Sequence, residues 1–183
     1  MTRNILIWPV LLALFAGCAD TPVKPGNGEV TLDQHLPLRL AVDMSPEDLV
    51  QMTHHFYYMR GYYGRWTEEG KLMRNAALTA FAPLVEQVLP REEMPAPDLI
   101  IKVSGSSFYN PAMRVWYVDV TATGYLPSGE EIASFKASSR LGSVVVFYER
   151  ALESTYVAAF QETGRKFLQS GALSAAARQH SPD

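Results

Sequence analysis

The chain has 183 residues, of which 48% are apolar and 19% are charged, and its formal net charge is −3. This length fits one domain of ordinary size, and the apolar content excludes a chain that is disordered throughout. The charge lacks the excess of Lys and Arg that binding to phosphate backbones requires, so we expect no nucleic-acid partner. The single cysteine excludes an internal disulfide framework and a cysteine-rich zinc or iron–sulfur site within one chain.

The amino terminus has the pattern of a secretory signal. One basic residue, Arg3, precedes an apolar run over residues 5–15, which at about 1.5 Å per residue covers roughly half of a ~30 Å hydrocarbon core. Small residues, Ala16 and Gly17, stand directly before Cys18. A positive start, a short apolar run and a small-residue cleavage site predict a signal peptide over residues 1–17.

The segment 14–18 (LFAGC) resembles the lipobox of bacterial lipoproteins, which usually ends in Leu-Ala-Gly-Cys; here Phe15 replaces the usual Leu. The resemblance implies that Cys18 receives a diacylglyceryl group and becomes the acylated amino terminus, with palmitate as the typical acyl chain. The alternative is a free cysteine behind an ordinary signal peptide. Ala19 follows where Asp would retain such a protein at the inner membrane. The resemblance therefore implies anchoring to the outer membrane, on its periplasmic side.

Cleavage before Cys18 leaves 166 residues and, with Arg3 lost, a net charge of −4. Residues 18–33 hold two Pro and two Gly and few bulky apolar groups, which predicts a lipidated flexible tether. We assign residues 34–171 to a single globular domain. The tail, 172–183, lacks an evident apolar stripe and is expected to fray.

The first half of the domain combines a strand, an aromatic segment and a helix. Alternating apolar residues over 36–44 predict a strand with one buried face, and Ser45-Pro46 reads as a helix start. The aromatic segment 54–66 is ambiguous, because its aromatic residues favour strand and its two glycines favour a turn. Helical spacing over 68–89 places Val85 and Val88 on one apolar face, with a kink or break near Pro83.

The second half predicts mainly strands, followed by a helix. After a loop over 90–97, residues 98–107 read as a strand, and 114–126 with 130–138 as a hairpin. Residues 142–148 read either as a fifth strand or as the entry to the last helix. That helix covers 149–170, and Gly171 is well placed to end it.

This order predicts an α+β domain: a mixed, mainly antiparallel sheet of four to five strands with two long helices packed on one face. The other sheet face would be exposed or would pack on a partner. The layout resembles the small α+β domains of envelope-assembly lipoproteins, among them those that activate cell-wall synthases, and the amino-terminal domain of TolB-type proteins.

Motifs of known chemistry are missing from the sequence. There is no Gly-rich phosphate loop, no His-Glu-x-x-His pair and no Gly-x-Ser-x-Gly elbow, and lipidation of Cys18 leaves no thiol nucleophile. In a strand, His54 and His55 would point to opposite faces and could not easily reach one metal, so we expect no metal site. We also expect no cofactor. The paired acids at 68–69, 92–93 and 130–131 read as solvated turn and helix-start residues.

The most distinctive feature is a cluster of aromatic residues interleaved with arginines. Tyr and Arg are enriched in protein interface hot spots, whereas Tyr and Trp faces also stack on sugars or lie at membrane interfaces. The third reading is an edge strand with half its aromatic residues in the core. The cluster consists of Phe56, Tyr57, Tyr58, Arg60, Tyr62, Tyr63, Arg65 and Trp66. A second group, 108–109 and 116–117, would extend the surface or belong to the core.

These observations predict a non-enzymatic, lipid-anchored accessory or structural subunit of a cell-envelope assembly. It would contact an envelope protein through the aromatic-Arg cluster, and assembly with further copies of the chain stays open. The alternative is a binding module or carrier for a glycan or lipid, with a concave site lined by Tyr58, Tyr62, Tyr63 and Trp66. A small hydrolase is the third reading, and it would require distant acids to converge in a deep pocket.

Overall fold

The computed structural model describes residues 35–58, 62–142 and 148–180, with side chains for all of these except 55–58, 62–65 and 180. Five strands form the main sheet, in the order β4-β1-β5-β6-β7. They are β1 (Leu36–Asp43), β4 (Val85–Pro90), β5 (Leu99–Asn110), β6 (Val115–Tyr125) and β7 (Glu131–Gly142). A separate two-stranded sheet is made by β2 (Thr53–Tyr58) and β3 (Tyr62–Thr67).

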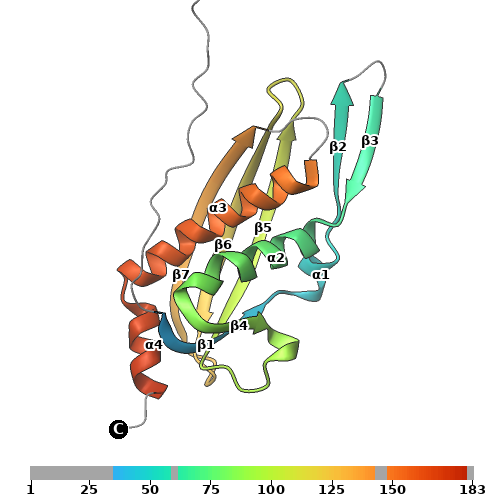
Figure 1. Ribbon diagram of the computed structural model, residues 1–183. Coiled ribbons are helices and arrows are strands. Elements are labelled where there is room, and N and C mark those ends of the chain that lie inside the picture. The colour runs from blue at the N-terminus through green and yellow to red at the C-terminus, as the bar shows by residue number, and fades with distance from the viewer. Residues whose placement is uncertain (1–34, 59–61, 143–147, 181–183) are drawn as a thin grey trace, which may run out of the picture.

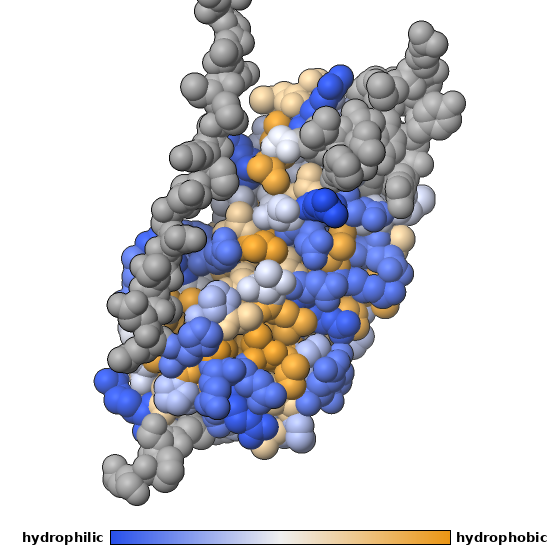
Figure 2. All heavy atoms as spheres, viewed as in Figure 1, coloured by the Kyte–Doolittle hydropathy of each residue, from blue (hydrophilic) through white to orange (hydrophobic). Residues whose placement is uncertain are grey.

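The helices are α1 (Pro46–Leu49), α2 (Glu69–Phe81), α3 (Tyr148–Gln169) and α4 (Ala172–His180), with 3₁₀ turns η1 (Ala82–Leu84) and η2 (Arg91–Glu93). Figure 1 shows α2 and α3 lying across one face of the main sheet. The α+β class, the mixed and mainly antiparallel sheet and the two helices on one face are confirmed. On the helix-covered side, Figure 2 shows hydrophilic residues around an apolar area near η1 and β4.

Sheet topology combines a parallel and an antiparallel half. β1 pairs in parallel with β4 on one side and with β5 on the other, whereas β5–β6 and β6–β7 are long antiparallel pairs. The β6–β7 hairpin predicted from the Pro-Ser-Gly turn is confirmed, and Gly129 in that turn adopts φ 90°. β5 and β6 continue well beyond the end of β1, whose pairing with β5 stops at Asp43 opposite Lys102.

Capping, proline and glycine residues set the ends of several helices where the sequence predicted them. The side chain of Ser45 accepts a hydrogen bond from the Asp48 amide at 3.0 Å and caps α1, with Pro46 in the first turn. α2 ends at Phe81, directly before the 3₁₀ turn that contains Pro83. Gly171 follows α3 with φ 76°, a conformation that is easy for glycine and costly for other residues.

Two predictions of secondary structure are wrong. Residues 85–90 form the edge strand β4, not the end of a helix, because Pro83 stops the helix and β1 offers a parallel edge. Residues 172–180 form the helix α4, not a frayed tail. Its buried residues Leu173, Ala176 and Ala177 follow helical spacing, and α4 packs against β1 and α3. The stripe is made mostly of alanine, so its hydrophobic signal is weak.

The core lies between the two long helices and the sheet. Phe81 of α2 packs edge-on against Phe167 of α3, with ring centroids 6.4 Å apart, and Phe135 of β7 meets Phe167 edge-on at 4.8 Å. Trp116 and Tyr156 are also fully buried. This core leaves two surfaces to consider, the β2–β3 hairpin and the sheet face away from the helices.

Candidate interaction surface

The aromatic-Arg cluster lies on the β2–β3 hairpin. The register pairs Tyr58 with Tyr62, Tyr57 with Tyr63 and His54 with Trp66. Phe56 pairs with Gly64 and His55 with Arg65, whereas Arg60 lies outside the described residues. The strand reading of this ambiguous segment is therefore confirmed. Whether the rings from Phe56 to Tyr63 are core or surface stays untested, because these side chains are outside the described set.

Trp66 is the one member of the cluster whose side chain is described. Its side chain is 62% exposed, and its ring stacks on the imidazole of His54 across the strand pair, with centroids 4.6 Å apart and planes 22° from parallel. Its neighbour Thr67 is 3% exposed, as strand alternation requires at the boundary with the core. The base of the hairpin thus presents a large aromatic surface to solvent.

The base of the hairpin is held to the core by a buried carboxylate. Glu69, the first residue of α2, is 2% exposed, and its carboxylate accepts hydrogen bonds from Tyr156 Oη at 2.5 Å and from Gln51 Nε2 at 3.0 Å. Burial, together with the Glu69 carboxylate, raises the pKa of Tyr156 above its usual range. The expectation that Glu69 is a solvated helix-start residue is wrong, because α3 and the segment before β2 close over it.

Close backbone packing at the same point requires a glycine. The amide of Gly70 donates to the carbonyl of Gln51 at 3.1 Å. A Cβ at position 70 would lie 2.1 Å from the carbonyl oxygen of Asp48 and 2.4 Å from that of Leu49. α1 therefore packs directly on the first turn of α2, and the chain leaves this contact straight into β2.

The second surface is the face of β5–β7 away from the helices, here called the open face. Residues on the helix side are less exposed than their neighbours along each strand, although Ala137 is the one buried residue of β7. The register aligns the residues of the other side in five rows across β5, β6 and β7. The rows are Phe108–Tyr117–Arg140, Ser106–Asp119–Ser138, Ser104–Thr121–Lys136, Lys102–Thr123–Ser134 and Ile100–Tyr125–Glu131.

The second aromatic group of the sequence, 108–109 and 116–117, is divided between the core and the open face. Tyr109 and Trp116 are 7% and 0% exposed and pack on Tyr148, whereas Phe108 is 63% exposed. Phe108 and Tyr117 face each other across the strands with centroids 6.3 Å apart. Alternation along the strands therefore places Tyr109 and Trp116 in the core and Phe108 and Tyr117 on the open face.

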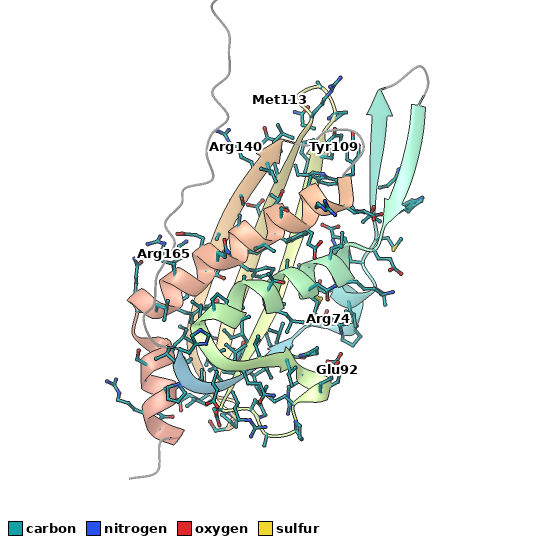
Figure 3. All side chains as sticks on the ribbon, viewed as in Figure 1. Arg74, Glu92, Tyr109, Met113, Arg140 and Arg165 are labelled. Carbon is teal, nitrogen blue, oxygen red and sulfur yellow. The ribbon has the colours of Figure 1, made fainter. Side chains whose placement is uncertain are left out.

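Acidic and histidine side chains do not assemble into a metal site among the described residues. Glu68 and Glu92 form ion pairs with Lys71 and Arg74, each at 2.8 Å, and Figure 3 shows Arg74 and Glu92 at the end of the molecule away from Met113. Among the described helices, none is both long and apolar enough to cross a bilayer.

Comparison with known protein families and with curated proteins finds no match. A crystal structure of an uncharacterized protein has a TM-score of 0.51 at 11% identity, covering 73% of this chain and 96% of that chain. A candidate lipoprotein from Caulobacter crescentus CB15 gives 0.38 at 15% identity, covering 63% and 87%. PelC from Paraburkholderia phytofirmans, determined as a dodecamer, gives 0.44 at 12%, covering 70% and 86%. At 11% identity the first likeness concerns the fold alone, and the other two are weaker.

Proposed function

We propose that this protein is a non-enzymatic lipoprotein, anchored through Cys18 to the periplasmic side of the outer membrane. In this proposal it serves as an accessory or structural subunit of a cell-envelope assembly, and it contacts a partner protein through the β2–β3 hairpin. The observation that carries the proposal is the separation of this hairpin from the main sheet. A two-stranded sheet is marginally stable alone, so an aromatic one gains stability from a partner surface.

The exposed chemistry at the base of the hairpin supports a protein contact. Trp66 offers a broad apolar ring with a polar N–H edge, and its stacking on His54 restricts its orientation before any partner binds. Trp, Tyr and Arg are the residue types most enriched in interface hot spots, and this hairpin contains all three. The contact with Gln51 and Glu69 fixes where the hairpin leaves the domain.

The position of the hairpin also suits a tethered protein. Figure 1 shows the end of β2 and the tip of the β5–β6 hairpin at one end of the molecule, and the start of β1, with α4, at the other. The chain from the proposed lipid enters the domain at the start of β1. The domain would therefore present the end of β2 and the tip of the β5–β6 hairpin away from its own anchor.

Site-specific photo-crosslinking of the full-length, lipidated protein in its own cells tests this proposal. A photoreactive residue at Trp66 is expected to give a discrete adduct with one envelope protein, identified by mass spectrometry. The matched control places the same residue at Ser154, an exposed position on α3. Absence of a discrete adduct at Trp66, or the same adducts at both positions, would contradict the proposal.

A further inference from the structure

The open face is long, and it is polar at its centre. Tyr117 and Tyr125 lie eight residues apart on β6, which corresponds to about 27 Å along the strand. Between their rows lie six hydroxyl side chains: Ser104, Ser106, Thr121, Thr123, Ser134 and Ser138. Thr123 and Ser134 share a hydrogen bond of 2.8 Å, so part of this hydroxyl array is already oriented.

Aromatic rings stand at both ends of this array. At the distal end, the Phe108–Tyr117 pair is flanked by Met113, which is 61% exposed, and Figure 3 shows Met113 and Arg140 at this end of the molecule. At the other end, the Lys102 ammonium lies 5.1 Å from the centroid of the Tyr125 ring. Rings of this kind offer flat apolar faces to a ligand without losing much conformational freedom.

Charge on the open face differs in sign from that of the chain. In the four rows from Phe108 to Lys102 there are three exposed cations, Lys102, Lys136 and Arg140, against one carboxylate, Asp119. That carboxylate accepts a hydrogen bond from Ser138. Glu131 lies in the fifth row, beyond these four. The face is therefore locally positive on a chain with a net charge of −3.

We propose that the open face binds an extended anionic glycan, which would lie along the strands from the Phe108–Tyr117 row towards Tyr125. Sugar rings would stack on the aromatic side chains, their hydroxyls would bond to the Ser and Thr rows, and their carboxylates would meet Lys136 and Arg140. A protein hot spot would have an apolar, desolvated centre, and an inserting membrane surface would have apolar residues along its length. The open face has hydroxyls at its centre, which favours a glycan over both.

Calorimetric titration of the full-length protein in detergent with an oligomer of galacturonic acid tests this proposal. Lys136→Glu and Arg140→Glu are each expected to weaken binding by about tenfold, because each reversal removes one attraction and adds one repulsion. Phe108→Ala is expected to weaken binding by a similar factor through lost stacking. The matched control is Arg178→Glu, an exposed reversal on α4. Thermal melting of each variant checks that the fold is kept.

Three outcomes would overturn the proposal. The first is no binding of the oligomer by the unaltered protein. The second is binding that all three open-face variants keep, or that an uncharged oligoglucose matches. The third is binding to phosphatidylglycerol vesicles that Lys136→Glu and Arg140→Glu abolish, with no binding of the oligomer, which would assign the face to a membrane surface.

Discussion

Removing one hydroxyl group from the core tests how the hairpin base is held. Tyr156→Phe keeps the fully buried ring but deletes the donor that lies 2.5 Å from Glu69 Oε1. Glu69 is 2% exposed, so water does not readily replace this donor. A buried hydrogen bond to a charged group contributes about 1.5–3 kcal/mol, and we expect the free energy of unfolding to fall by about that amount. For a chain of this size the midpoint of thermal unfolding would drop by roughly 4–10 °C.

The assay is urea unfolding of the full-length protein in detergent, monitored by circular dichroism. The matched control is Tyr117→Phe. Among the described residues, the one acceptor for Tyr117 Oη is Met113 Sδ, at 3.8 Å, so loss of this hydroxyl should change stability by less than about 0.5 kcal/mol. A double variant with Glu69→Met removes both partners and should cost clearly less than the sum of the single changes. A loss below about 0.5 kcal/mol for Tyr156→Phe, or strict additivity in the double variant, would refute the reasoning.

Four further changes have defined outcomes. Raising the pH above about 10 should lower the melting temperature of the protein. In the unfolded chain tyrosines ionise near their usual pKa of 10.0, whereas burial raises the pKa of Tyr148 and Tyr156 in the folded protein. A melting temperature that does not change up to high pH would contradict this prediction. Gly70→Ala should cost about 1–3 kcal/mol in urea unfolding, because its Cβ would meet α1 carbonyl oxygens, and a neutral result would mean that α1 moves freely. Leu173→Ala should cost about 2–4 kcal/mol in the same assay, whereas no loss would mean that α4 contributes nothing to the core. Cys18→Ser should abolish incorporation of labelled palmitate, and labelling that persists would remove the lipid anchor from the proposal.

The strands and helices with strong local signals could be predicted from the sequence. Alternating apolar residues predict β1, Ser45 and Pro46 predict the start of α1, and Gly171 predicts the end of α3. β4 could not be predicted from the local sequence, because Val85 and Val88 are three residues apart and fit a helical pattern as well as a strand. Its strand conformation depends on parallel pairing with β1, more than 40 residues away in the sequence.

The sequence could also predict some features of the candidate surfaces and not others. The aromatic cluster could be found from the sequence, and its aromatic enrichment predicted the strands β2 and β3. Gly64, which favoured a turn, lies within β3 opposite Phe56. The role of Glu69 could not, since the sequence shows an acidic pair at a helix start and not the Tyr156 hydroxyl, 87 residues away. The layout predicted a sheet face without helices, but not which residues it aligns, because only the strand register places Phe108, Tyr117 and Arg140 in one row.

Under the proposed anchoring at Cys18, the distance from the bilayer decides what the domain can touch. Leu36 precedes Leu40, which pairs with Leu99, so the β5–β6 tip lies 15 strand residues further on, or about 50 Å away. Seventeen residues stand between Cys18 and Leu36 in the sequence, and a flexible tether of that length would span roughly 20–25 Å on average. In the proposed anchoring, such a tether would keep the start of β1 near the bilayer and would not return the far end of the β5–β6 hairpin to it. The exposed Phe108, Met113 and Trp66 surfaces would then meet partners in the space beyond the membrane, which is where both proposals place their ligands.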